Sequence, residues 1–114
     1  MNSIWSDRER VDREIQTVEY VQLEYDPDWG CYLSQEVPFT GFCVQRFPDG
    51  TLENVVQLQQ GINHGVTVVW FSDGGMQLYR ELQAGVLHGE CIEWGEDGGK
   101  IVDEHYHEGR LIEA

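Results

Sequence analysis

The chain has 114 residues, a length that favours one domain with a modest hydrophobic core. It carries 7 Lys and Arg against 21 Asp and Glu, a formal net charge of −14. This acidic excess argues against binding to nucleic acid or to anionic membranes, which requires clustered cations, and favours either a basic partner or simple solubility. No signal peptide or membrane span is predicted and three cysteines suggest no disulfide framework, so we expect a cytoplasmic protein.

The N-terminal region, residues 1–37, is predicted to be a cap. Ser6 and Glu9 have the spacing of a capping box, and Val11 and Ile15 lie four residues apart, which predicts a short helix over about 6–15. Residues 17–35 read as a degenerate hairpin with its turn at 26–30. We expect this hairpin to cover the N-terminal edge of a sheet.

Glycines then recur in three series that share one period, at 41, 65 and 89, at 50, 74 and 98, and at 61, 85 and 109. They define three repeats, 38–61, 62–85 and 86–109, followed by a tail at 110–114. Each copy reads as a strand, an Asp-Gly turn and a second strand, for example 66–71 and 77–82, and so predicts a β-hairpin. Because isolated hairpins are marginally stable, we expect a mainly β fold in which the three stack as one meandering antiparallel sheet.

The repeat positions also predict two different faces. Even-numbered positions are the more apolar, at 44/68/92 (Val, Val, Ile), 46/70/94 (Arg, Trp, Trp) and 58/82/106 (Leu, Leu, Tyr), and we expect them to share the core side. Odd-numbered positions carry polar and mostly acidic residues. They include Gln45, Glu53, Gln77, Glu81, Glu93 and Asp103.

Several residues are interpreted as structural. His64 and His88 share one repeat position before a glycine, and Asp49, Asp73 and Asp97 share another in the hairpin turn, so we expect both sets to shape turns. Cys43 and Cys91 are four strands apart in the expected sheet, about 19 Å, which excludes a disulfide between them. We expect them to act as small apolar side chains.

Catalytic and metal-binding motifs are weak. Residues 95–101 imitate a phosphate loop, but Ile101 stands where a Ser or Thr would hold magnesium, and residues 26–30 read as a turn and not as a calcium loop. His105 and His107, two apart on a strand near Asp103, leave open a transition-metal site and a metal-dependent hydrolase. We nevertheless expect no enzyme activity, cofactor or metal.

The pattern HG-x4-WF-x-DG…LQAG, its two companions and the lead-in WGCYLSQEVPFTGFCVQRFPDG (29–50) resemble the MORN-repeat variant proteins, specifically the YwqK-like antitoxins of bacterial toxin–antitoxin modules. The resemblance covers about residues 29–109. This sequence departs from the family pattern at Thr40, which replaces the first histidine, at Gly95, which replaces an aromatic residue, and in having Lys100 as its single lysine. The resemblance implies an antitoxin, or immunity protein, that neutralises a cognate polymorphic toxin by direct binding.

The charge and the resemblance together lead to one hypothesis about mechanism. An acidic sheet face would cover the basic substrate cleft of a cationic, nuclease-like toxin in a 1:1 complex, the free protein being a monomer. The residues expected to bind this partner are Tyr79, Glu81, Glu93, Asp103, His105, Trp70 and Trp94. A place in the core is the alternative for both tryptophans. A generic MORN scaffold without a toxin partner is the alternative function.

Overall fold

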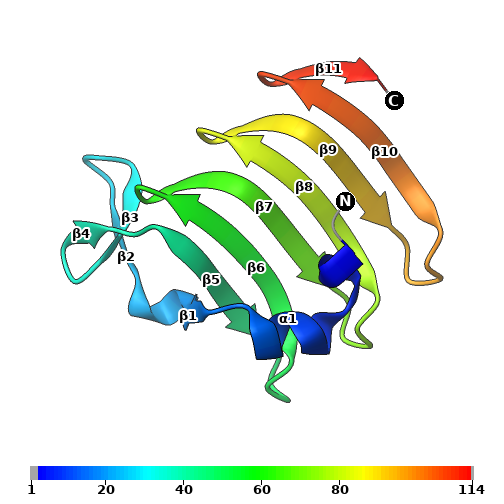
Figure 1. Ribbon diagram of the computed structural model, residues 1–114, viewed down its shortest axis with the longest axis horizontal. Coiled ribbons are helices and arrows are strands. Elements are labelled where there is room, and N and C mark those ends of the chain that lie inside the picture. Colours follow the sequence, from blue (N-terminus) through cyan, green and yellow to red (C-terminus); the bar gives the residue numbers. More distant parts are fainter. Residues whose placement is uncertain (1–2, 114) are drawn as a thin grey trace.

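The computed structural model describes residues 3–113 as a mainly β protein built on one large sheet (Figure 1). Its strands follow the order β1-β5-β6-β7-β8-β9-β10-β11, and every pair is antiparallel except β1 with β5. The bounds are β1 Thr17–Glu19, β5 Gly41–Arg46, β6 Leu52–Gln59, β7 Ile62–Trp70, β8 Met76–Gln83, β9 Val86–Trp94, β10 Lys100–His107 and β11 Arg110–Glu113. The expected fold class, mainly β with a large antiparallel sheet and a short N-terminal helix, is confirmed.

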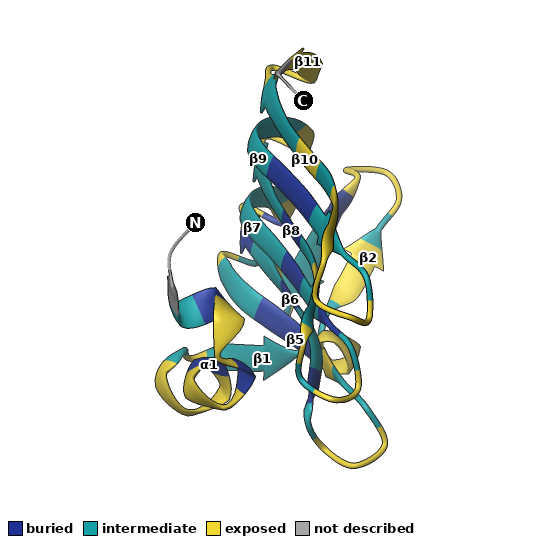
Figure 2. Ribbon diagram, turned by 90° about the vertical axis from the view of Figure 1, so that its right-hand side faces the viewer, coloured by how far each residue is buried: buried dark blue, intermediate teal, exposed yellow. Residues whose placement is uncertain are grey.

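The region before β5 differs from the expected edge cap. A hairpin does form, from β2 (Glu24–Asp26) and β3 (Cys31–Ser34), but it pairs with β4 (Val37–Pro38) in a separate three-stranded sheet. The edge of the large sheet is β1 instead, paired in parallel with β5. Figure 2 shows β2 on one side of the large sheet and α1 on the other. Residues 1 and 2 of the expected cap lie outside the described residues.

The small sheet is attached to the large one at Gly61, in the turn between β6 and β7. The Tyr32 N–H donates to the Gly61 carbonyl at 2.8 Å, and the Gly61 N–H donates to the Phe39 carbonyl at 2.7 Å. A Cβ on Gly61 would lie 2.5 Å from the Tyr32 carbonyl oxygen. Only glycine therefore allows β3 to pass this close, and the crossing directs the hairpin over the sheet face and away from its edge.

The C-terminal segment also differs from the prediction. Residues 110–114 were expected to be a tail, but Arg110–Glu113 form β11, which pairs with β10 and makes the second edge of the large sheet. Residue 114 is not among the described residues. Leu111 and Ile112 on this strand are 51% and 66% exposed.

Equivalent turn contacts recur along the sheet with the period of the glycine series. At one end, the Oδ1 atoms of Asp49, Asp73 and Asp97 each accept a backbone N–H from the residue two positions later at 2.9 Å. At the other end, Thr40 Oγ1, His64 Nδ1 and His88 Nδ1 accept the N–H of Gln60, Ala84 and Glu108 at 3.0–3.2 Å. The expected turn roles of the aspartates and of the two histidines are confirmed, and Thr40 makes the contact of the histidine it replaces.

The expected division of the faces is wrong for half of the strands. Directly paired residues present side chains on the same face. Val68 pairs with Tyr79 and Ile92 with Asp103, so odd positions in β8 and β10 share a face with even positions in β7 and β9. The series Leu58, Leu82 and Tyr106 consequently lies on the opposite face.

A β-bulge is the physical reason for this change of face. Just after each Asp-Gly turn, the pairing of β5 with β6, β7 with β8 and β9 with β10 skips one residue. The skipped residues are Glu53, Gln77 and Ile101. One extra residue on one strand reverses the alternation beyond it.

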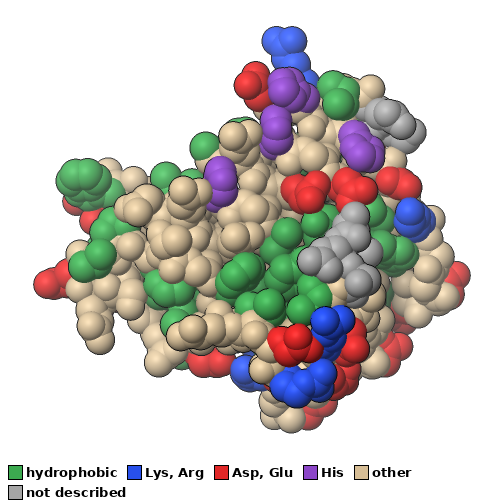
Figure 3. All heavy atoms as spheres, in the orientation of Figure 1, with side chains coloured by type: hydrophobic (Ala, Val, Ile, Leu, Met, Phe, Trp, Pro, Cys, Tyr) green, Lys and Arg blue, Asp and Glu red, His purple; other side chains and the backbone are tan. Residues whose placement is uncertain are grey.

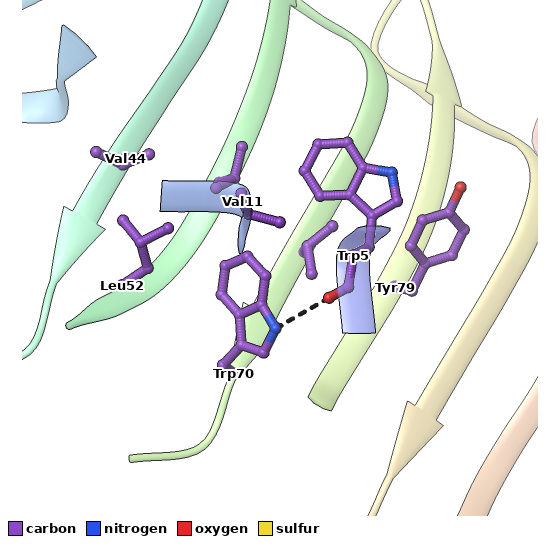
Figure 4. Close-up of a cluster of buried hydrophobic side chains, with 8 residues drawn as sticks. Trp5, Val11, Val44, Leu52, Trp70 and Tyr79 are labelled. Carbon is purple, nitrogen blue, oxygen red and sulfur yellow. Dashed lines mark hydrogen bonds between the residues drawn. The ribbon is translucent and has the colours of Figure 1, made fainter. Parts of the chain in front are cut away.

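The core lies between the large sheet and the N-terminal helices, which are η1 (Ser3–Ser6) and α1 (Arg8–Glu14). Trp5 and Val11 pack with residues of β5 to β8. In Figure 4, Trp5 lies between Trp70 and Tyr79, and its carbonyl accepts the Trp70 indole N–H at 3.1 Å. The expected helix is confirmed near the predicted range, although its N-cap is Asp7, which accepts the Arg10 N–H at 3.1 Å, and not Ser6.

Arg46 joins the N-terminal region to the edge of the sheet. Its guanidinium donates two hydrogen bonds to Asp12 at 2.9 and 3.0 Å and one to Glu19 at 3.0 Å. The bonded guanidinium lowers the pKa of the Asp12 carboxyl. Trp70 and Trp94 hold the equivalent positions in the next two copies of the sequence pattern, so this arginine replaces an aromatic residue where α1 and β1 need an ionic partner. Within residues 3–113, no helix has both the length and the apolar character needed to cross a membrane.

The core packing predicts unequal effects for two tryptophan substitutions. Trp5→Ala should lower the free energy of unfolding by about 3 kcal/mol, because a 7% exposed indole leaves a cavity over the sheet. Trp29→Ala, at an 82% exposed side chain in the β2–β3 turn, should change it by about 0.5 kcal/mol or less. Urea unfolding followed by circular dichroism measures both. Equal effects would contradict the assignment of Trp5 to the core.

Candidate partner-binding surface

The structure separates the seven residues that the sequence offered for partner binding. Trp70 and Tyr79 are 0% and 2% exposed and belong to the core, so their assignment as contact residues is wrong. Both belong to the buried cluster that also contains Trp5 and Val11 of the N-terminal helices. For Trp70, the alternative of a core position is correct.

The remaining five do not form one acidic face. Trp94, Glu81, Asp103 and His105 lie on the face that also carries α1, since Trp94 pairs with Lys100, Glu81 with Val66 and Asp103 with Ile92. Glu93 pairs with Leu78 and lies on the opposite face. The expectation of an acidic face opposite an apolar one is therefore wrong, because acidic and apolar side chains share both sides of β9 and β10.

Glu81 is held by contacts within the protein. Its Oε1 atom accepts the Glu90 N–H at 2.7 Å, and its Oε2 atom accepts the Tyr79 hydroxyl at 2.9 Å. The residue stands at a register shift between β8 and β9, where the first bond satisfies a backbone group that the ladder leaves free. The Glu81 carboxylate therefore serves mainly to stabilise the sheet, because both of its oxygens accept hydrogen bonds within the protein.

Gln57 makes the same contact at the equivalent position of the preceding hairpin, where its Oε1 accepts the Val66 N–H at 3.1 Å. In both places the neighbouring strand carries a glycine, Gly65 or Gly89, and an added Cβ would overlap the accepting side chain. This close approach accounts for two of the three glycines in one series, Gly65 and Gly89. The sequence held the information, because Gln57 and Glu81 occupy one repeat position.

Tyr79 completes this small network. Burial and the hydrogen bond to Glu81 raise the pKa of its hydroxyl well above the ordinary value. The hydroxyl is thus a stable donor to the carboxylate. A buried, hydrogen-bonded tyrosine of this kind is a structural group, which agrees with its place in the core.

A hollow of about 340 Å³ opens beside Trp94 on the α1 face. Its floor is apolar and includes Phe71, Met76 and Trp94, and its rim includes Glu96 and the turn glycines Gly95 and Gly98. Figure 3 shows a band of hydrophobic side chains across this face with acidic side chains beside it. An apolar floor with an acidic rim suits a cationic, partly apolar ligand.

A second hollow, of about 200 Å³, lies on the opposite face between the small sheet and β5 to β7. Its lining carries hydroxyl and amide groups from Tyr20, Tyr32, Gln45 and Asn54 and no charged side chain. The two tyrosine hydroxyls are 3.1 Å apart, and this hydrogen bond together with burial raises the pKa of Tyr32 to about 12. The site offers no group that ionises near neutral pH.

The thiol and imidazole groups have structural surroundings. All three cysteines are free and buried, and burial raises the pKa of Cys43 to about 11 and also that of Cys91. The rings of His88 and His107 are 4.9 Å apart, with His88 Nδ1 already bonded to the Glu108 N–H. Among the described residues, no group of three or more His, Cys, Asp or Glu side chains has the arrangement of a metal site.

Comparison with known proteins finds no relative of this chain. No family model matches the chain, and neither a curated protein nor a solved structure is significantly similar to it.

The role of Glu81 predicts that its charge matters less than its shape. Glu81→Leu should lower the free energy of unfolding by about 2 kcal/mol, because the Glu90 N–H and the Tyr79 hydroxyl both lose their acceptor. Glu81→Gln should keep most of the stability, since Gln57 shows that an amide oxygen accepts the same bond. Denaturant unfolding of both variants measures this difference. An equally large loss in Glu81→Gln would contradict it.

Proposed function

We propose that this protein is an antitoxin, or immunity protein, that binds a cationic protein toxin and blocks its action without catalysing a reaction itself. The observation that carries the proposal is the net charge of −14 on a sheet whose β9–β11 part extends beyond the N-terminal helices and the small sheet (Figure 1). The resemblance of residues 29–109 to YwqK-like antitoxins supports the same class of function. The cytoplasm is the proposed location.

The charge pattern supports a basic protein as the partner. Acidic residues lie on both faces of β9 and β10 and in the β9–β10 turn, among them Glu93, Glu96, Asp97 and Asp103. Four of the seven basic residues lie outside β8 to β11, and within this region Lys100 is paired with Asp103 at 3.1 Å. Arg8, Arg10 and Arg13 are on α1, and Arg46 is bonded to Asp12 and Glu19. A nuclease-like toxin, whose cleft must bind phosphates, would present the complementary charge.

Co-purification tests the proposal. The tagged protein is expressed together with the open reading frames that adjoin its gene, and bound polypeptides are identified and their stoichiometry measured. We expect a basic polypeptide at a 1:1 ratio that stops growth when it is expressed alone. A partner that is harmless alone would favour the scaffold alternative, and recovery of no partner would contradict both functions.

The electrostatic basis of binding predicts strong salt dependence. Raising the ionic strength from about 0.05 M to about 0.5 M should slow association with the basic partner about tenfold, because screening removes long-range attraction, and should change dissociation much less. Surface plasmon resonance at several salt concentrations separates the two rates. An association rate that does not respond to salt would show that the net charge of −14 has no part in recognition.

A further inference from the structure

The N-terminal segment shows how a polypeptide docks on this sheet. Arg8 Nη1 donates to the carbonyl oxygens of Phe71 and Ser72, at 3.1 and 3.3 Å, in the β7–β8 turn. Three residues earlier, the Trp5 side chain packs on the core, and its carbonyl accepts the indole N–H of Trp70. Docking thus uses an apolar residue, its carbonyl oxygen and an arginine three positions later.

The next turn along the sheet offers the same backbone geometry. In the β7–β8 turn, the Gly74 N–H donates to the Phe71 carbonyl at 2.9 Å, and in the β9–β10 turn the Gly98 N–H donates to the Gly95 carbonyl at 3.0 Å. The Arg8 guanidinium lies 3.4 Å from the place of a Cβ on Gly74, whereas the corresponding place at Gly98 has no atom within 4 Å. The position equivalent to that of the guanidinium is open.

The indole of Trp94, beside this turn, is also available for contact. Trp94 holds the position of Trp70 in the next hairpin, and it is only partly buried at the margin of the core. No acceptor within residues 3–113 is bonded to its indole N–H, whereas the Trp70 N–H has the Trp5 carbonyl. The hollow of about 340 Å³ lies beside this indole, lined by Met76 and Trp94 and, from the N-terminal segment, by Ser6.

Charge distinguishes the open turn from the occupied one. The β9–β10 turn carries Glu96 and Asp97, both exposed, where the β7–β8 turn carries Ser72 and Asp73. The additional carboxylate lies on the rim of the hollow. An arginine is therefore a more favourable occupant here than in the position that Arg8 fills.

We propose that the partner inserts a segment of the pattern apolar-x-x-Arg into the hollow beside Trp94, copying the docking of Trp5 and Arg8 one hairpin further along the sheet. The apolar side chain covers Met76 and Trp94, its carbonyl accepts the Trp94 indole N–H, and the guanidinium donates to the carbonyls of Gly95 and Glu96. This inference rests on the proposed function, since it names the part of a basic protein partner that is recognised.

The test compares variants in binding to the basic polypeptide from the co-purification. Trp94→Ala and Glu96→Lys should each weaken the affinity about tenfold or more. Glu96→Lys changes an exposed turn residue, so it remains informative if Trp94→Ala folds poorly. Glu24→Lys is the matched control, because it changes the net charge equally at an exposed position in the small sheet, and it should cost less than about threefold. Unchanged affinity for both hollow variants would overturn the inference and leave the antitoxin function standing.

Recovery of no partner would contradict the antitoxin and scaffold functions but not this mode of docking. In that case a peptide decides the question. The probe is an acetylated, amidated peptide with the sequence of residues 4–8, Ile-Trp-Ser-Asp-Arg, titrated into the ¹⁵N-labelled protein. Support is given by shifts at the Trp94 indole N–H and the Gly98 amide that are lost when glutamine replaces the arginine of the peptide. Shifts that are absent at millimolar peptide, or that survive this replacement, overturn the inference.

Discussion

Trp5 and Val11 supply the apolar cover on which the large sheet depends. A sheet with one hydrophobic face needs a second layer, and a meander of hairpins does not provide one by itself. Here the second layer is only two short helices, η1 and α1, so a few side chains carry most of the packing over β5 to β8. Two arginines hold the polar side of the helices to the sheet. Arg8 donates to the β7–β8 turn, and Arg46 of β5 donates to Asp12 of α1. The position of the helices decides which residues can meet another molecule.

Much of the fold could be predicted from the sequence because its determinants are local. Asp49, Asp73 and Asp97 close turns by accepting the N–H of the next residue but one, and the left-handed backbone at Gly61, Gly85 and Gly109 is a property of single positions. The division of the faces could not be predicted by counting, because one bulge residue in each hairpin reverses the alternation. The small sheet was misplaced for a related reason, since its position depends on the contact between Tyr32 and Gly61, which are far apart in the sequence.

The candidate surface was predicted only in part. A partner-binding region in β8 to β10 stays a prediction, but two of its residues are not available to a partner: Tyr79 is in the core, and both carboxylate oxygens of Glu81 accept hydrogen bonds within the protein. Whether a side chain of the sheet is accessible depends on how far the N-terminal helices extend across the strands. The repeat pattern of the sequence does not encode that limit. The repeat position of Arg46, Trp70 and Trp94 held a partial indication. Arg46 is bonded to Asp12 of α1, and Trp70 is buried under the N-terminal helices. Trp94, beyond these helices, is only partly buried.

The uneven cover has a consequence for the dynamics of the sheet. Strands under the helices and the small sheet share a packed core, whereas β10 and β11 are stabilised chiefly by pairing with their neighbours. Opening of backbone hydrogen bonds is easiest where few buried apolar contacts must be broken. The backbone hydrogen bonds of β6 and β7 are therefore the hardest to open, and those toward β11 are the easiest. A molecule that binds at the β9–β10 turn would tighten β10, one of the two strands with the least apolar cover, so recognition and local ordering would occur together.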